Sequence, residues 1–225
     1  MLSGKNRSCE SQLILLTNDL TKSIDDKKMT DIAVLDFSKA FDVIPHQRLL
    51  WKLDYYGIRS NTKSWITGFL TERLQRVCVN GNSSDWMPVL SGTPQGTALG
   101  PHLFLLYIND IHEKVSSTVR LFADDCMLYR TIDSAEDEKI LQQDLDYMVE
   151  WSNTWGMHFN PTKCEIMRVT RKKSTGTMAY NILGVNLKEV KETKYLGVKL
   201  QSDLRWNSQT HYAALPKEPL VSLAS

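Results

Sequence analysis

The chain has 225 residues, of which 42% are hydrophobic and 24% are charged, and its formal net charge is +1. This composition is typical of a globular protein, and it excludes a collagen-like or disordered chain while leaving room for one large domain or two small ones. The apolar runs are all shorter than the roughly 20 residues that cross a bilayer.

A helix and a strand are predicted at the start of the chain. Residues 8–24 repeat apolar side chains at helical spacing, and Ser8 is a suitable capping residue. The apolar run at 32–35 contains β-branched residues, which is typical of a buried strand, and it leads directly into Asp36. Two more helices are predicted in the next part, at residues 45–56 and 63–70.

The middle of the chain is rich in turn signals. Residues 76–90 predict a β-hairpin, because Asn80-Gly81 is a preferred two-residue turn between strands. A glycine-rich loop at 92–100 then leads into a strongly apolar helix predicted at 103–111. Two short strands are predicted on either side of Asp124 and Asp125, at residues 119–122 and 127–129.

The last third begins with the clearest helix, at residues 133–155, where apolar side chains form one face and acidic side chains the other. Three strand-like segments follow, at 165–169, 180–187 and 195–200. Strands and helices that do not alternate strictly favour an α+β fold over a doubly wound parallel sheet. The tryptophans at apolar helical positions are expected to pack in the core: Trp51, Trp65, Trp151 and Trp155.

The four cysteines lie far apart and include no C-x-x-C pair. This spacing argues against a zinc ribbon or a disulfide framework and favours free thiols in a reducing compartment. Residues 1–7 contain no apolar signal-peptide core. We therefore expect an intracellular protein that is not associated with a membrane.

Two carboxylate positions adjoin apolar strands. Asp36 follows one strand, and Asp124 and Asp125 occupy a turn between two others. Crowded carboxylates repel one another unless a cation neutralises them, and Mg²⁺ prefers a few carboxylates together with phosphate oxygens. The alternative is that each Asp belongs to an ordinary turn, since turns are rich in Asp.

The segments around these residues resemble the ordered motifs of reverse transcriptases. Leu-Asp-Phe-Ser-Lys-Ala-Phe-Asp at 35–42 resembles motif A, Ser-Gly-Thr-Pro-Gln-Gly at 91–96 motif B, and Phe-Ala-Asp-Asp at 122–125 motif C. Residues 160–164 resemble motif D and residues 194–198 motif E. The sequences of these motifs are most similar to those of enzymes of non-LTR (LINE-type) retrotransposons, and the resemblance extends from about Gly4 to Trp206. The resemblance implies a polymerase palm, an antiparallel sheet backed by helices.

The resemblance also implies a catalytic centre. Asp36, Asp124 and Asp125, with the main-chain carbonyl of Phe37, would hold two Mg²⁺ ions, for which Mn²⁺ could substitute. Phe41 would be the steric gate that excludes the 2′-hydroxyl of a ribonucleotide, because an aromatic ring offers that hydroxyl a clash and no hydrogen bond. Without the motif, Phe41 would be expected to be an ordinary core residue.

Further positions match motifs B, D and E. Gln95 and Gly96 would contact the incoming nucleotide, and Lys163 would assist the pyrophosphate leaving group as proton donor or counter-charge. A primer grip would be formed by three consecutive residues, Tyr195, Leu196 and Gly197. The alternatives are a plain turn at motif B, a solvated surface lysine, and the edge strand of a hairpin.

The domain prediction follows from the same motifs. Residues 1–30 would be a remnant of the fingers, residues 31–206 the palm, and residues 207–225 a short divergent tail in place of a full thumb. Charge is segregated along the chain: residues 105–150 hold 4 basic and 11 acidic side chains, whereas residues 160–200 hold 9 basic and 3 acidic ones. An acidic centre beside a basic surface suits a metal-dependent enzyme that follows phosphates.

Two functions remain in competition at this stage. In the first, the chain is an RNA-directed DNA polymerase that adds deoxynucleoside triphosphates to a DNA primer on an RNA template. In the second, it is a truncated and inactive retrotransposon relic that retains at most weak RNA or protein binding. An RNA-dependent RNA polymerase shares the carboxylates but is disfavoured by the bulky Phe41.

Overall fold

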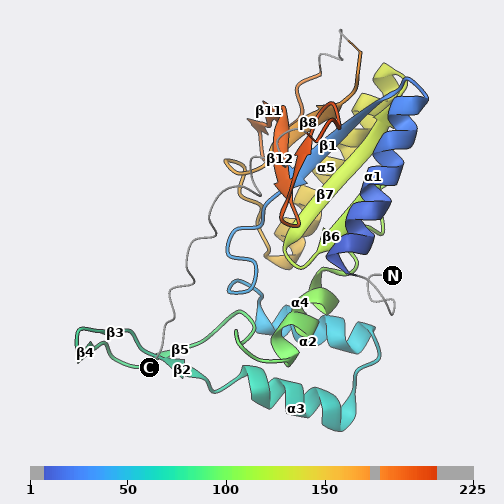
Figure 1. Ribbon diagram of the computed structural model, residues 1–225. Helices are drawn as coiled ribbons and strands as arrows, with labels where there is room; N and C mark the ends of the chain where they lie inside the picture. The colour runs from blue at the N-terminus through green and yellow to red at the C-terminus, as the bar shows by residue number, and fades with distance from the viewer. Residues whose placement is uncertain (1–7, 173–177, 207–225) are drawn as a thin grey trace.

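The computed structural model describes residues 8–172 and 178–206 (Figure 1). Its five helices are α1 (Cys9–Asp25), α2 (His46–Tyr55), α3 (Ser60–Leu70), α4 (Leu99–Ile108) and α5 (Ala135–Trp155). The strands of the first two thirds are β1 (Met29–Leu35), β2 (Leu74–Gln75), β3 (Cys78–Val79), β4 (Asn82–Ser83), β5 (Met87–Pro88), β6 (Thr118–Phe122) and β7 (Asp125–Ile132). The last third contains β8 (Glu165–Val169), β9 (Asn181–Ile182), β10 (Val185–Asn186), β11 (Lys188–Val190), β12 (Glu192–Tyr195) and β13 (Val198–Gln201).

A five-stranded sheet in the order β11–β8–β1–β7–β6 forms the centre of the molecule. Strand β1 pairs antiparallel with both β7 and β8, and β6 pairs antiparallel with β7. Only the edge strand β11 runs parallel to its neighbour β8. The predicted α+β fold, a mainly antiparallel sheet backed by helices, is confirmed.

The sheet separates two hydrophobic layers, because side chains alternate between the faces of a strand. Ala33 and Leu35 of β1 pack into a cluster with α5 and with the helices α2, α3 and α4. Ile32 belongs to the opposite cluster, which includes α1 and the β12–β13 hairpin. Figure 1 shows α1 and α5 on opposite sides of the sheet. Every helix of the described chain is too short or too polar to cross a membrane.

Both long helices are capped, and the predicted cap at Ser8 is present. Ser8 caps α1 by accepting a hydrogen bond from the backbone N–H of Ser11, and the Ser11 hydroxyl oxygen in turn accepts one from the Ser8 N–H. Helix α5 ends at Gly156, whose φ of 71° is the left-handed conformation that glycine adopts most readily. The prediction for α4 was wrong at both ends, since the helix spans Leu99–Ile108. Its first turn accommodates Pro101, as a helix start does.

The strands predicted at 180–187 and 195–200 are instead hairpins. Strands β9 and β10 are joined by Leu183-Gly184, and β12 and β13 by Leu196-Gly197. Both residues of each pair have positive φ, as Asn80 and Gly81 do in the β3–β4 turn. Glycine supplies one left-handed position in each turn, while leucine occupies the other against its usual preference.

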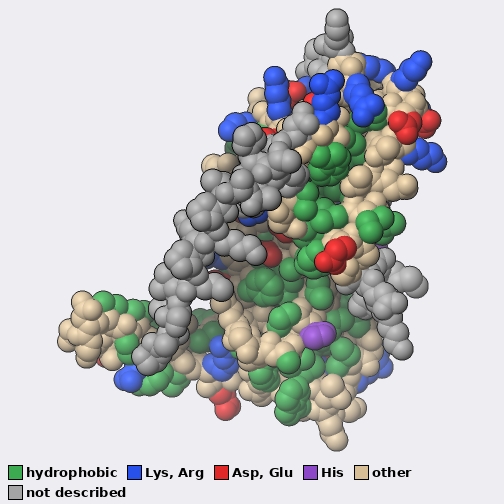
Figure 2. Space-filling view, viewed as in Figure 1, with side chains coloured by type: hydrophobic (Ala, Val, Ile, Leu, Met, Phe, Trp, Pro, Cys, Tyr) green, Lys and Arg blue, Asp and Glu red, His purple; other side chains and the backbone are tan. Residues whose placement is uncertain are grey.

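Two surfaces remain apolar. The β2–β5 hairpin extends away from the body of the molecule (Figures 1 and 2) and exposes large hydrophobic side chains, namely Leu74, Val77, Val79, Trp86 and Met87. Trp51 and Trp65 are also exposed, at 56% and 63%, so the prediction that they pack in the core was wrong. Helical spacing identifies an apolar face but does not show whether another element covers it.

Candidate active site

The pairing of β1 with β7 brings the carboxylates together at one end of the sheet. Leu35 lies opposite Cys126, so Asp36, which follows Leu35, adjoins Asp125, which precedes Cys126. Phe122 pairs with Asp125, which leaves Asp124 in the two-residue turn between β6 and β7. Two segments that are distant in sequence thus meet at one sheet end, as motifs A and C imply.

The electrostatics of this end reflect crowding of negative charge. Partial burial, together with the charges of Asp124 and Asp36, raises the pKa of Asp125. Within residues 8–172 and 178–206, no three His, Cys, Asp or Glu side chains already form a group that could hold a metal ion. A divalent cation relieves repulsion of this kind. The donor set therefore suits such an ion, and binding would require these side chains to turn toward it.

Motif D holds motif A in place from the other side of β1. The N–H of Asn160 donates to the carbonyl of Asp36 at 2.8 Å, and the N–H of Ser38 donates to His158 at 2.8 Å. The Phe37 ring is 6% exposed and stacks on Phe159 at 4.5 Å between ring centroids. The Phe37 ring is therefore part of the packing, and a role for its main-chain carbonyl at the site stays a prediction.

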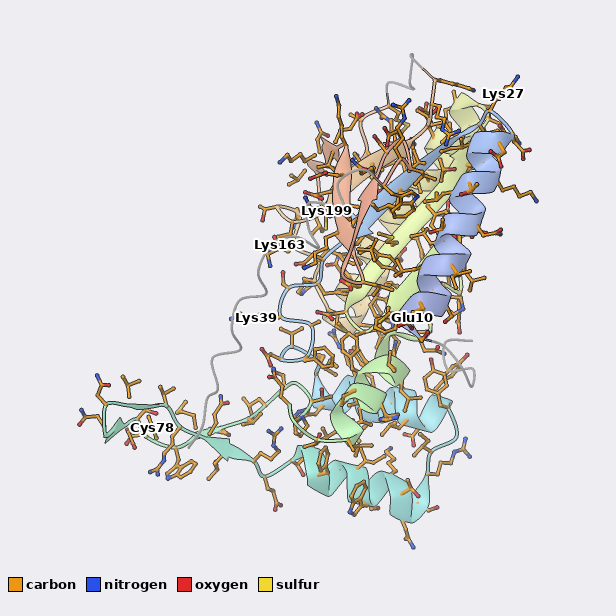
Figure 3. The ribbon with its side chains drawn as sticks, viewed as in Figure 1. Glu10, Lys27, Lys39, Cys78, Lys163 and Lys199 are labelled. Atoms are coloured by element: carbon orange, nitrogen blue, oxygen red, sulfur yellow. The ribbon has the colours of Figure 1, made fainter. Side chains whose placement is uncertain are left out.

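Lys163 lies at the carboxylates. Its Nζ is 3.7 Å from Oδ2 of Asp36, and both side chains are accessible, at 65% and 42% exposure. Figure 3 shows Lys163 and Lys39 on the same side of the molecule. The ammonium is thus available to a negatively charged group bound beside Asp36.

The motif B loop is bound to the turn that follows Asp36. The N–H of Gly92 donates to Ile44 at 2.8 Å, and the N–H of Thr93 donates to Phe41 at 2.9 Å. A Cβ on Gly92 would lie 2.8 Å from the backbone of Asp42, and its φ is +81°. The backbones of motif B and motif A therefore approach each other closely at Gly92. Gly96 has a φ of +75° and open space around it, so only its conformation requires glycine.

Gln95 has a partner in motif A. Its Nε2 donates to Oδ1 of Asp42 at 3.0 Å. The two side chains line a polar hollow of 590 Å³ at the base of the β2–β5 hairpin, together with the basic residues Lys39 and Arg73. Sequence reasoning did not single out this pair, since nothing in the local pattern indicates a contact across 53 residues.

Phe41 is half-buried, and its ring stacks on Phe104 of α4 at 4.3 Å between centroids. It also lines a hollow of 280 Å³ with Thr93, Gln95 and Gly96 of motif B. The two interpretations of this residue, core packing and contact with a ligand, are compatible because one ring takes part in both.

The predicted primer grip lies close to the carboxylates. Tyr195 is 2% exposed, and burial, with a contribution from the charge of Asp125, raises its pKa to about 12. Leu196 and Gly197 form the turn of the β12–β13 hairpin. The turn is therefore accessible to a ligand, whereas the Tyr195 ring is part of the core beneath it.

Comparison with known proteins agrees with this geometry. Residues 4–200 match the family model described as reverse transcriptase (RNA-dependent DNA polymerase). The RNA-directed DNA polymerase from mobile element jockey of Drosophila melanogaster is 28% identical over 213 residues, covering 87% of this chain and 22% of the relative. The probable RNA-directed DNA polymerase from transposon X-element of the same species is 30% identical over 210 residues, with 87% and 22% covered.

Solved telomerase structures share the fold. Telomerase from Candida albicans, in complex with a fragment of telomeric RNA, aligns with a TM-score of 0.60 at 11% identity, covering 88% of this chain and 33% of that one. Apo telomerase from Candida tropicalis, truncated from the C-terminal domain, aligns with a TM-score of 0.57 at 14% identity, covering 88% of this chain and 39% of that one. Because the family model spans most of the sequence and the motif residues meet at one sheet end, the chain belongs to the reverse transcriptase (RNA-dependent DNA polymerase) family, and its relatives include the polymerases of non-LTR retrotransposons.

Proposed function

We propose that this chain is the catalytic palm of an RNA-directed DNA polymerase of a non-LTR retrotransposon, which extends a DNA primer on an RNA template. The observation that carries the proposal is the register of β1 against β7, which sets Asp36 beside Asp125 with Asp124 in the adjoining turn. The chain spans 22% of the jockey polymerase, so activity of the whole protein is part of the proposal.

Asp36, Asp124, Asp125 and the main-chain carbonyl of Phe37 would hold two Mg²⁺ ions, with Mn²⁺ as a substitute. When bound, such ions activate the primer 3′-hydroxyl and stabilise the leaving oxygen of the triphosphate. Lys163 acts on the leaving group: its ammonium, 3.7 Å from Asp36, is within reach of a pyrophosphate at the carboxylates and can donate a proton or a counter-charge.

The deoxynucleoside triphosphate would occupy the hollow between Phe41 and the motif B loop. Gln95, oriented by Asp42, and the backbone at Gly96 contact it. The Phe41 ring, supported by Phe104, excludes a ribose 2′-hydroxyl.

The primer terminus would lie against the turn at Leu196 and Gly197, with Tyr195 fixing the hairpin from beneath. In this proposal the fingers remnant is residues 1–30 and the palm residues 31–206. The predicted tail, residues 207–225, lies outside the described residues.

A second candidate is a folded but inactive relic, which would keep the same sheet and the ion pair of Lys163 with Asp36 without catalysing synthesis. Both candidates retain the fold, so they differ in whether the chain catalyses synthesis.

Primer extension on an RNA template, with Mg²⁺ and then Mn²⁺, distinguishes them. We expect extension by the wild type and a loss of at least about a thousandfold in Asp124→Ala, because a lost metal ligand removes charge stabilisation from the transition state. Asp85→Ala, at an exposed aspartate of the β2–β5 hairpin, is the matched control and should retain activity. A folded wild type that extends no primer under either ion would support the relic.

A further inference from the structure

The side chain of His46 is bound to the loop of motif B. Its Nε2 lies 2.8 Å from the carbonyl oxygen of Gly92, and the imidazole is half-buried. His46 is the first residue of α2, and the residue before it, Pro45, forms an isolated β-bridge with Ser91. The bridge places the start of α2 beside motif B, so the ring reaches a loop that lies 46 residues further along the chain.

The chemistry of this contact fixes its direction. A backbone carbonyl can only accept a hydrogen bond, so the proton of the neutral imidazole must lie on Nε2. Gly92 is buried, and the described part of the chain offers its carbonyl no donor other than His46. Because a buried carbonyl without a donor is unfavourable, loss of the ring would disfavour the present position of the loop.

The same stretch of motif B borders the predicted nucleotide site. Thr93, which follows Gly92, donates its N–H to the carbonyl of Phe41 at 2.9 Å. Phe41, Thr93 and Gln95 line the 280 Å³ hollow that the nucleotide would occupy. The spacing between the Phe41 ring and motif B therefore depends on how firmly the loop is held at Gly92, which is where His46 binds it.

We propose that His46 is a positioning residue, which anchors motif B against Phe41 and so sets the width of the hollow in which the sugar is selected. The anchoring follows from the hydrogen bond alone. The effect on sugar selection rests on the proposed function, because a steric gate excludes a 2′-hydroxyl only while the opposite wall stays in place. His46 acts through the loop rather than on the reacting atoms.

Two substitutions separate the hydrogen-bond donor from the ring that carries it. In His46→Gln the side-chain amide places an N–H close to the position of Nε2, whereas the shorter side chain of His46→Asn ends near the position of Nδ1. We therefore expect His46→Gln to keep the bond to Gly92 and His46→Asn to lose it. His102→Asn, at an exposed histidine of α4 whose ring contacts the carbonyl of Ala98, is the matched control.

The tautomer of His46 can be measured in the wild type, with no variant. Long-range proton–nitrogen NMR spectra of the full chain at about pH 8, where an ordinary imidazole is neutral, distinguish the two neutral forms. We expect the form that carries its proton on Nε2. The form with the proton on Nδ1 would overturn the proposal, since its Nε2 has nothing to donate to Gly92.

Amide hydrogen exchange tests the anchoring in the variants. Exchange at Gly92 and Thr93 should be about tenfold faster in His46→Asn than in the wild type, and unchanged in His46→Gln and in the control. Exchange at Ala33 in β1 should be the same in all four proteins, because the sheet does not depend on this bond. Unchanged exchange at Gly92 and Thr93 in His46→Asn, or an equal increase at Ala33, would contradict a local anchoring role.

Sugar selection is measured by the ratio of kcat/KM for dATP to kcat/KM for ATP in primer extension. The ratio does not depend on the folded fraction of the enzyme, so a purely structural effect would leave it unchanged. We expect it to fall about three- to tenfold in His46→Asn and to be retained in His46→Gln. In a chain that already carries Phe41→Ala, His46→Asn should cause no further fall, because the gate is absent.

An unchanged ratio in His46→Asn, or an equal fall in His46→Gln, would overturn the role in selection. If the chain extends no primer, the proposed polymerase function fails, while the tautomer and the exchange rates still decide whether His46 anchors motif B.

Discussion

The side chain of Gln95 donates a hydrogen bond to Asp42 at 3.0 Å and so connects motif B with the last residue of motif A. Both residues line the polar hollow at the base of the β2–β5 hairpin. The contact fixes the direction of an otherwise exposed amide, as the proposed contact of Gln95 with a nucleotide requires.

Removing this contact should affect substrate binding more than chemistry. In Asp42→Ala, we expect the KM for deoxynucleoside triphosphate to rise about three- to tenfold with a smaller change in kcat, because Gln95 loses its orienting acceptor. Steady-state primer extension measures both constants. Asp42→Asn retains an acceptor oxygen and should stay closer to wild type; equal effects of the two variants would contradict the positioning role.

Gly92 should not tolerate a side chain. In Gly92→Ala the new Cβ would lie 2.8 Å from backbone atoms of Phe41 and Asp42, at a φ of +81°, so we expect a loss of about 2–4 kcal/mol in the free energy of unfolding. Urea denaturation measures it.

Two other glycines serve as controls for Gly92. Gly96→Ala has a similar φ in open space and should cost about 1 kcal/mol. Gly68→Ala, in open space in the last turn of α3, should stabilise by up to about 0.5–1 kcal/mol. If Gly92→Ala cost no more than Gly96→Ala, the close approach of motif B to motif A would be relaxed in solution.

Asp31 should make stability depend on pH. It is fully buried on β1, accepts a hydrogen bond from Tyr180 at 2.7 Å, and has Nε of Arg168 at 3.7 Å. Burial raises its pKa from 3.8 to about 6. The folded chain thus holds this proton more tightly than the unfolded chain, so the stabilisation is complete below about pH 4 and is lost as the pH rises through about 6.

Asp31→Asn removes this titration. As the pH rises from 4 to 7, the wild type should lose up to about 3 kcal/mol in the free energy of unfolding that Asp31→Asn does not lose. Parallel wild-type and Asp31→Asn profiles from chemical denaturation at each pH would show that Asp31 does not titrate in this range.

Lys52 should be required for the packing of α2 on α4 and α5. Its side chain is 2% exposed, contacts Asp110 at 2.5 Å, and lies 3.9 Å from the Trp155 ring centroid. Lys52→Met should cost about 3 kcal/mol, because the largely buried Asp110 loses its counter-charge.

The double variant tests that explanation. Asp110→Asn removes the uncompensated charge, so Lys52→Met combined with Asp110→Asn should unfold at a higher temperature than Lys52→Met alone. No recovery in thermal denaturation would mean that the lysine stem, rather than its charge, stabilises the contact.

Sequence alone predicted the parts of the fold that depend on local pattern. The cap at Ser8 and the strand before Asp36 follow from nearby residues, and the ordered motifs indicated that Asp36 meets Asp125. The Leu196-Gly197 turn was missed because leucine seldom adopts positive φ, and an unbroken apolar run around it looks like one strand.

Contacts between distant elements could not be predicted in this way. The exposure of Trp51 depends on which helices surround α2, and the partner of Gln95 depends on how motif B folds back on motif A.

The pairing of β1 on both edges has a consequence for how the site is assembled during folding. A slip of one residue against β7 would move Asp36 away from Asp125 and, at the same time, turn Ile32 and Ala33 into the wrong hydrophobic layers. A misfolded chain that formed the sheet without the carboxylate cluster would therefore also lose the packing of both hydrophobic layers. Forming the native sheet and aligning the aspartates are one event.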